Sequence, residues 1–255
     1  MQDTQPQSGR SDALQETSDN TSGLIIGDLP DRSGRAFGDR PQLSEEIAAY
    51  IRELVMSGRL RGGQPINIEA LARELRTSPT PIREALHVLR GEGFIQVEPR
   101  RGYRIAPLSR RDVEDMFLIQ GMISGELAAR AAEAADEQFI DEIVGIQSEL
   151  QQAEARSDDN HIQQLNYEFH RLINLRDSSP KLTWLLSLLV RYVPRVLYST
   201  IDGWHTESLH GHEAVIDALR RKDPDAARLA MRAHFAHAGE QLASHLERHG
   251  FWEGT

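Results

Sequence analysis

One stretch of this 255-residue chain decides its fold, and its centre reads Ser78-Pro79-Thr80-Pro81-Ile82-Arg83-Glu84-Ala85-Leu86. Ser78 is a favourable N-cap, and Pro79 stands at the first helical position, where a missing N–H removes no hydrogen bond. Pro81 is still within the first turn and is tolerated there. The apolar face of this helix continues through Ile82, Ala85, Leu86 and Leu89. The stretch therefore predicts a helix that ends at Gly91 or Gly93.

The segments on both sides of this helix complete a recognisable order of elements. Apolar residues at helical spacing predict one helix over about 44–57 and another over about 68–75. After the central helix, residues 94–98 and 103–106 have the pattern of two short strands around a turn at 99–102. A helix, a tight turn, a second helix and a two-stranded hairpin with a basic tip predict a winged helix-turn-helix, a fold that binds DNA.

The position of each polar residue in this fold predicts which side chains meet DNA. The second helix of a helix-turn-helix lies in the major groove, and its first residues reach the base edges. The residues expected on DNA are Arg76, Ser78, Thr80, Arg83, His87, Arg100, Arg101 and Gly102. Arg83 is the strongest candidate, because its guanidinium can pair with guanine O6 and N7. A lone exposed arginine is usually a solvated charge, but here the turn, the cap and the basic hairpin occur together.

The distribution of charge agrees with a small DNA-binding unit in an acidic chain. The net charge is -10, which is unusual for a protein that binds nucleic acid. Residues 43–107 nevertheless carry +2, whereas residues 1–42 carry -3 and residues 108–255 carry -9. The arginines of the mildly basic segment must therefore be clustered to bind phosphates.

Composition narrows the class of protein further. The chain has no cysteine, which excludes disulfides and thiolate metal sites and agrees with a cytoplasmic protein. We find no run of about 18 apolar residues, so we expect no membrane partner. Residues 1–40 are polar and are expected to be a disordered tail. We expect the DNA-binding domain over 41–108 and a second domain over 109–255.

The second domain is expected to be an antiparallel all-α bundle, which makes the protein mainly α. Strand patterns are absent after Ser109, and proline follows a capping residue at Ser179-Pro180 and Asp223-Pro224. Helices with short connections pack as antiparallel bundles. The predicted helices cover about 110–133, 137–156, 159–175, 180–199, 207–221 and 224–248.

Four polar residues of this bundle form a candidate metal site. Asn166 and His170 are four residues apart, so they project from the same helix face. His212 precedes an apolar run, and His234 lies among apolar residues of the last helix. Three nitrogens and one oxygen from three helices can hold a divalent metal. The alternative is that each histidine is a hydrogen-bonded residue of the core, which is the more common case.

The first domain resembles the N-terminal domain of the GntR family of bacterial transcription regulators. The matching residues are Leu71-Ala72, Leu75, Thr80-Pro81-Ile82-Arg83-Glu84-Ala85-Leu86, Leu89, Glu92-Gly93-Phe94, Gly102 and Ala106-Pro107-Leu108. The family often has an arginine after the N-cap serine, where this chain has Pro79. That difference removes one expected DNA contact and leaves the fold intact.

Residues 110–249 resemble the FadR-type C-terminal domain, the FCD domain, which follows the GntR module in a large subfamily. Many members bind a metal through an Asp-x-x-x-His pair and two later histidines, and His170, His212 and His234 fit this pattern. The resemblance implies a divalent metal, with zinc preferred and nickel or manganese as alternatives. Asn166 replaces the usual aspartate, which removes one negative charge from the site.

The resemblance also implies a small-molecule effector, commonly an organic acid. Gln120 stands where many members have an arginine that meets the effector's carboxylate, which weakens the expectation of a small carboxylate here. Arg191 and Arg195 are the candidate substitutes for that arginine, although as helix residues they can equally be surface charges.

The sequence thus predicts a ligand-responsive transcription regulator that is not an enzyme. We expect a repressor that binds a palindromic operator on double-stranded DNA as a homodimer. A metal-dependent enzyme is one alternative, because three histidines with an open position can activate water. A metal with a purely structural role in the bundle is another.

Overall fold

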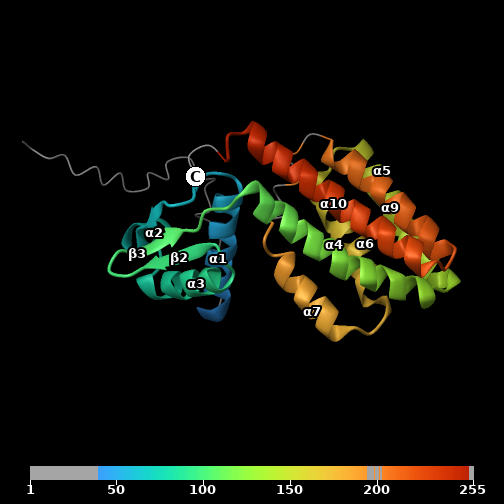
Figure 1. Ribbon diagram of the computed structural model, residues 1–255, viewed down its shortest axis with the longest axis horizontal. Helices are drawn as coiled ribbons and strands as arrows, with labels where there is room; N and C mark the ends of the chain where they lie inside the picture. The colour runs from blue at the N-terminus through green and yellow to red at the C-terminus, as the bar shows by residue number, and fades with distance from the viewer. Residues whose placement is uncertain (1–39, 194–197, 199–200, 202, 253–255) are drawn as a thin grey trace, which may run out of the picture.

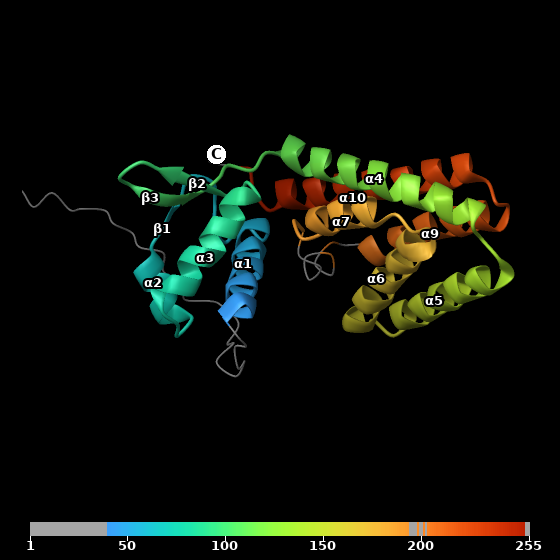
Figure 2. The same ribbon diagram turned by 90° about the horizontal axis from the view of Figure 1, so that it is seen from below.

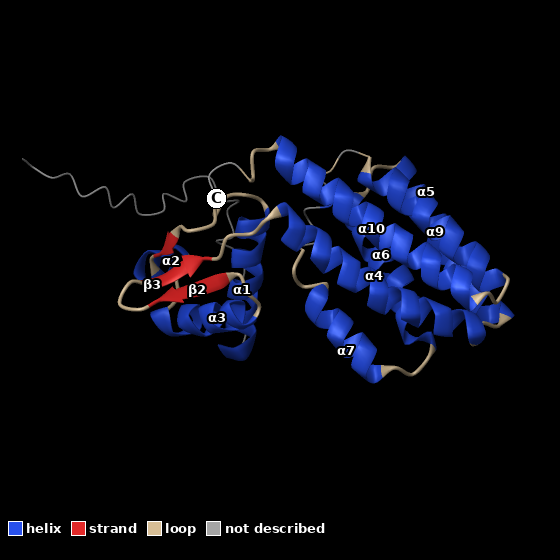
Figure 3. Cartoon of the chain, viewed as in Figure 1, coloured by secondary structure: helices blue, strands red, loops and turns tan. Residues whose placement is uncertain are grey.

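A computed structural model describes residues 40–193, 198, 201 and 203–252, so residues 1–39 of the predicted tail lie outside the described residues. Figure 1 shows two parts along the long axis, with the blue and cyan N-terminal elements at one end and the long green to red helices at the other. The same two parts can be told apart after a turn of 90° (Figure 2). Within the described residues, strands occur only in the N-terminal part (Figure 3).

The N-terminal part contains the predicted helices, here α1 (Arg40–Met56), α2 (Ile68–Glu74) and α3 (Pro79–Gly91). Asn67 caps α2, because its Oδ1 accepts a hydrogen bond from the Ala70 N–H at 2.9 Å. Ser78 occupies the N-cap position of α3 as predicted, but its side chain makes no capping hydrogen bond. An N-cap side chain pairs with the second or third N–H of a helix, and the third residue is Pro81, which has none.

The predicted two-stranded hairpin is present in the wing, and a third strand that was not predicted pairs with it. The strands β1 (Pro65–Ile66), β2 (Ile95–Glu98) and β3 (Gly102–Ile105) lie in the order β1-β3-β2, with both pairs antiparallel. The Ile105 N–H donates to the Gln64 carbonyl at 2.9 Å beside β1. A strand of two residues has no alternation of side chains along it, so the sequence pattern did not predict β1.

The C-terminal part is the predicted bundle of helices. Its described helices are α4 (Arg110–Glu133), α5 (Glu137–Ala155), α6 (Asp159–Arg176), α7 (Pro180–Leu189), α9 (Trp204–Arg220) and α10 (Pro224–Arg248). Side chains cap several of them, and Ser109 forms a capping box with Asp112 at the start of α4. None of the described helices is long and apolar enough to cross a membrane.

Helix α7 ends at Leu189, whereas the sequence predicted one helix to about residue 199; residues 194–197 and 199–200 of that prediction lie outside the described residues. The Val190 N–H still donates to the Leu186 carbonyl at 3.0 Å, and the Tyr192 N–H donates to the Leu189 carbonyl at 3.0 Å. Pro194 has no N–H to donate to the Val190 carbonyl, which removes the next bond that an α-helix would need. Residues 190–193 follow α7 as a turn and a bend.

Two hydrophobic clusters form the core, and the first extends from the N-terminal part into the bundle. It joins buried residues of α1 and α3, such as Ile51 and Leu86, to Phe117, Leu242 and Phe251. The second cluster lies inside the bundle, around Phe139, Phe169, Ile173, Val215, Leu219 and Met231. Because the first cluster is continuous, the two parts share buried contacts.

Helices α4 and α10 run side by side along the bundle (Figures 1 and 2), and glycines permit their close approach. A Cβ on Gly125 would lie 2.9 Å from the backbone oxygen of Arg228, and one on Gly239 would lie 2.7 Å from the Phe117 Cβ. Real Cβ atoms do not approach a neighbour this closely. A larger residue at either position must therefore push the two helices apart.

We expect Gly125→Ala to lower the free energy of unfolding by about 1–3 kcal/mol, because the added methyl overpacks the contact with the Arg228 backbone. Gly145→Ala is the matched control, since Gly145 is an exposed glycine inside α5 with nothing within 4 Å of a built Cβ. There the better helix propensity of alanine should raise stability by up to about 1 kcal/mol. Urea denaturation of both variants checks this, and an equal gain in both would contradict tight packing at Gly125.

Candidate functional site

The predicted DNA-contacting residues of α3 lie on its exposed face. Pro81, Ile82, Ala85, Leu86 and Leu89 are buried. Thr80, Arg83 and His87 are exposed, as is Ser78 before the helix. Their spacing of three and four residues places Thr80, Arg83 and His87 on one stripe of the helix. This stripe is available for a groove of DNA.

The predicted contacts in the turn and the wing are also exposed. Arg76 has φ +51° in the turn before α3, and Arg100 and Gly102 have φ +67° and +89° at the wing tip. Figure 1 shows this tip pointing away from the bundle. Arg76, Arg83, Arg100 and Arg101 form no ion pair with another residue of the described part of the chain. Their positive charge is thus not neutralised within the protein.

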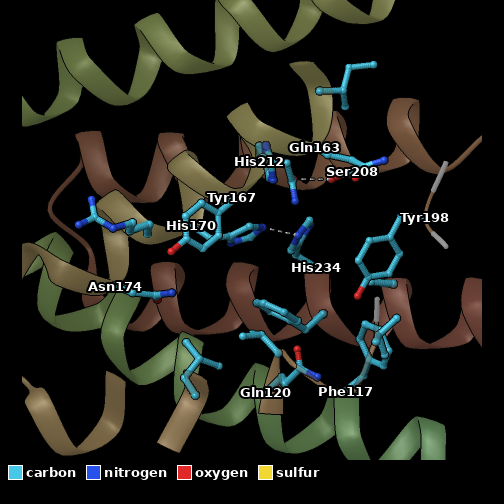
Figure 4. Close-up of a pocket in the computed structure, with 18 of the residues that line it drawn as sticks. Phe117, Gln120, Gln163, Tyr167, His170, Asn174, Tyr198, Ser208, His212 and His234 are labelled. Atoms are coloured by element: carbon cyan, nitrogen blue, oxygen red, sulfur yellow. Dashed lines mark hydrogen bonds between the residues drawn. The ribbon is translucent and has the colours of Figure 1, made fainter. Parts of the chain in front are cut away.

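Three of the predicted metal ligands meet inside the bundle. His170 comes from α6, His212 from α9 and His234 from α10, and one nitrogen of each lies within 4.8 Å of the others. His170 Nε2 and His234 Nε2 are 3.3 Å apart (Figure 4). Neutral imidazoles from three helices that converge on one point are a donor set suited to zinc, with a further coordination position left open.

Gln147 orients His212 and was missed by the sequence analysis. Its Oε1 lies 3.1 Å from His212 Nδ1, and its Nε2 donates to the Leu209 carbonyl at 3.1 Å. This hydrogen-bond network assigns the proton of His212 to Nδ1, which leaves the lone pair of Nε2 unused. Among the described residues His212 Nε2 has no hydrogen-bond partner although it is buried. The only signal in the sequence was a glutamine on the apolar face of α5.

Burial keeps the three imidazoles neutral. It holds the pKa of His170 well below the usual histidine value, with a further contribution from the charge of His234. Burial also holds the pKa of His212 well below that value, and His234 and His170 add to the effect. The pKa of His234 falls to about 4, first through burial and then through His237. Neutral imidazole is the form that binds metals, so protons compete weakly at this site.

The fourth predicted ligand, Asn166, lies one turn before His170 on α6. Its Oδ1 accepts a hydrogen bond from the Ser208 hydroxyl at 3.4 Å. Next to His212, a Cβ on Gly211 would lie 2.5 Å from His234 Nδ1, so only glycine allows α9 to approach this histidine. The sequence analysis did not single out Gly211, because the contact is between two helices that are distant in sequence.

The histidines open onto a cavity of about 430 Å³ between the helices. Of the residues predicted for an effector, Gln120 and Arg191 line this cavity, and Arg195 lies outside the described residues. Its apolar lining includes Phe117, Leu186, Val193, Trp204, Phe235 and Ala238. The cavity has the size of sites that enclose small organic ligands.

Comparison with known proteins agrees with both parts of this architecture. The model of the gntR family of bacterial regulatory proteins matches residues 43–105, and the FCD domain model matches residues 115–237. The HTH-type transcriptional regulator YdhC of Bacillus subtilis is 27% identical over 203 residues, which cover 77% of this chain and 89% of that protein. The HTH-type transcriptional repressor RspR of Escherichia coli is 24% identical over 213 residues, covering 82% and 93%.

Solved structures share the fold. The Escherichia coli protein McbR/YncC superposes with a TM-score of 0.59 at 24% identity, over 80% of this chain and 98% of that one. A putative GntR regulator from Rhodococcus gives a TM-score of 0.54 at 18% identity, over 79% and 97%.

These matches are to transcription regulators, and they do not support the metal-dependent enzyme considered from the sequence. The exposed α3, the basic wing and the helical bundle behind them agree with the matched families. The chain belongs to the GntR family of bacterial transcription regulators and carries an FCD domain after its winged helix-turn-helix.

Proposed function

We propose that this regulator is a ligand-responsive repressor that binds a palindromic operator as a homodimer and releases it when its cavity is filled. The observation that carries the proposal is one segment of chain, residues 190–193, that touches both the cavity and the DNA-binding part. Val190, Arg191 and Val193 line the cavity. Tyr192, between them, packs on the DNA-binding part.

The contact of Tyr192 is made directly behind the recognition helix. Its ring stacks on Phe94, with ring centroids 4.5 Å apart and planes at 30°. Phe94 follows α3 by three residues. Beside it, Arg191 pairs with Glu45 of α1 at 3.8 Å. A ligand that moves residues 190–193 would therefore act on α1 and on the end of α3. Such a movement would change how α3 is placed on DNA.

The end of α3 is tied to α1 and would transmit such a movement. Arg52 donates two hydrogen bonds to Glu92, at 2.7 and 2.9 Å. Glu92 is the C-cap of α3, and Arg52 belongs to α1 and is buried. A two-point pair of this kind holds its partners in one orientation. Filling the cavity then shifts the population between two placements of the DNA-binding parts.

An exposed apolar face supports the homodimer. Leu118, Ile119 and Met122 of α4 are 45–56% exposed, and Trp184, Leu185 and Leu188 of the neighbouring α7 are 42–56% exposed. Contiguous exposed apolar side chains of this kind mark protein contacts. A second copy bound two-fold symmetrically at this face would present two recognition helices to the two halves of a palindrome.

The relatives support repression as the sign of regulation. RspR of Escherichia coli is named a transcriptional repressor. A protein of Paenarthrobacter nicotinovorans, 23% identical over 198 residues, is named a probable repressor of a D-xylose utilization operon. From these relatives we propose repression for this chain, and we propose none of their substrates for it.

We further propose that His170, His212 and His234, with Asn166 as the fourth ligand, hold a divalent metal, with zinc preferred over nickel or manganese. The unpartnered His212 Nε2 and the convergence of three neutral imidazoles support this. A bound metal would supply an open coordination position at the cavity wall for an oxygen of the effector. A purely structural metal that only joins α6, α9 and α10 is the second candidate, favoured by the depth of burial of His212.

Replacing Arg83 with alanine should weaken binding to the promoter region beside the protein's own gene by about tenfold or more, because one base or phosphate contact is lost. Arg156→Ala, at the exposed end of α5, removes the same charge far from α3 and should bind as the wild type does. Fluorescence anisotropy at several salt concentrations measures both. Equal binding by the two variants would contradict the placement of α3 on DNA.

Substituting His234 with alanine should abolish stoichiometric metal, because one of three imidazole ligands is missing. His237→Ala is the control, since His237 lies one turn away on α10, half exposed, beside Glu207 at 3.5 Å. Elemental analysis of the purified proteins gives the metal content, and circular dichroism checks their folding. Unchanged metal in a folded His234→Ala protein would rule out this site. A metal that raises the melting temperature without altering DNA affinity would favour the structural role.

Tyr192→Ala should uncouple the bundle from the DNA-binding part. In the wild type we expect DNA affinity to differ between zinc-loaded and chelator-treated protein, and we expect the variant to lose most of that difference. Tyr192→Phe keeps the stack on Phe94 and should retain the response. Anisotropy with operator DNA measures all three proteins. A full response in Tyr192→Ala would show that the coupling takes another route.

A further inference from the structure

The side chain of Gln120 meets the cavity with its oxygen. Gln120 belongs to α4, is only 2% exposed and lines the cavity. Its Nε2 is sealed inside the protein and has no hydrogen-bond partner in the described part of the chain. Figure 4 shows the amide oxygen turned towards the side of the cavity on which the histidines lie. The atom that Gln120 offers to a ligand is therefore Oε1, a hydrogen-bond acceptor.

This oxygen has no donor from the protein. No hydrogen bond within the described residues uses Gln120 Oε1. Its surroundings are apolar, because Phe117 lies one turn earlier on α4 and Phe235 of α10 packs against Gly121. Buried polar atoms are nearly always paired. An unpaired acceptor that faces a cavity marks the place where a ligand atom carries a proton.

The charges of the cavity wall require this ligand atom to be uncharged. Among the described residues that line the cavity there is no lysine or carboxylate side chain, and both lining arginines, Arg171 and Arg191, are exposed. An ammonium beside Gln120 would lose its water without gaining an anion. A carboxylate has no proton to donate and is repelled by Oε1. A hydroxyl has the proton and no charge.

We propose that the cavity takes a mainly apolar ligand whose inner end is an uncharged hydrogen-bond donor, a hydroxyl, that donates to Gln120 Oε1. A dicarboxylate of the same length is rejected, because its second charge would be buried beside this oxygen. The inference rests on the proposed ligand response of the same cavity and adds the chemical class of the ligand. A carboxylate at the other end of the ligand suits the histidine side.

Matched probes on the full-length protein saturated with zinc test this class. Straight-chain ω-hydroxy acids of six, eight and ten carbons supply the donor. Their methyl ethers keep the oxygen without its proton, the acids that end in a methyl group lack both, and the diacids add a charge. Isothermal titration calorimetry gives each dissociation constant. At the best-fitting length the hydroxy acid should bind about fivefold tighter than the methyl-ended acid and the ether, and about tenfold tighter than the diacid.

Variants of Gln120 locate the effect. Gln120→Leu and Gln120→Met should remove the advantage of the hydroxy acid over the methyl-ended acid, because both variants lack the acceptor. Gln120→Glu should turn the preference towards the ω-amino acid of the same length, since a carboxylate neutralises its ammonium. Gln151→Leu, an exposed glutamine on α5, is the matched control and should keep the wild-type order. The methionine variant has nearly the length of glutamine, so it supplies the comparison if the leucine variant unfolds.

Each outcome bears on one claim. Equal or tighter binding of the methyl ether or the diacid by the wild type would overturn the ligand class. An unchanged order in both Gln120→Leu and Gln120→Met, or no binding of any probe at millimolar concentration, would also overturn it. Anisotropy with operator DNA, run in parallel, tests the response separately. A hydroxy acid that binds as expected without releasing DNA would support the ligand class and contradict the proposed function. Release by a diacid that binds tighter than the hydroxy acid would do the reverse.

Discussion

The close contact between α4 and α10 is the constraint on which the rest of this protein depends. Gly125 and Gly239 let the two backbones approach to a distance that a Cβ would prevent. From this pair, Gln120 and Phe117 face the cavity on one side and His234 and Phe235 face it on the other. The same two helices contribute Phe117 and Leu242 to the hydrophobic cluster that also contains residues of α1. Any separation of α4 from α10 would thus change the cavity and the support of the DNA-binding part together.

The interior of the bundle, beside the close contact of α4 and α10, contains buried polar side chains. Three imidazoles are kept neutral by burial, and Gln147 sets which nitrogen of His212 is free. Polar groups at this depth are normally paired within the protein. Here buried nitrogens of His170 and His212 have no partner in the described part of the chain. Such groups are retained where a ligand or metal completes them, which is why the cavity is the centre of our proposals.

Much of the fold was predictable from local sequence, and the errors have local or tertiary causes. The start of every described bundle helix except α9 was placed to the residue, because proline and capping residues mark it. Ser78 took the N-cap position without a capping hydrogen bond, and Pro81 removes one of the two N–H groups that its side chain could have bound. Strand β1 was missed because two residues show no alternation, and α7 was drawn too long because apolar spacing continued past Leu189.

The sequence by itself determined the order of elements, the exposed residues of α3 and the three histidines, because capping, periodicity and residue type act over a few neighbours. Only the tertiary structure decided that Gln147 orients His212, that Gly211 admits His234, and that Tyr192 joins the cavity wall to Phe94. These contacts join residues between 23 and 98 positions apart, and nothing in the spacing of such residues records their distance in space. The packing of whole helices brings these residues together. The proposed response to a ligand depends on these contacts.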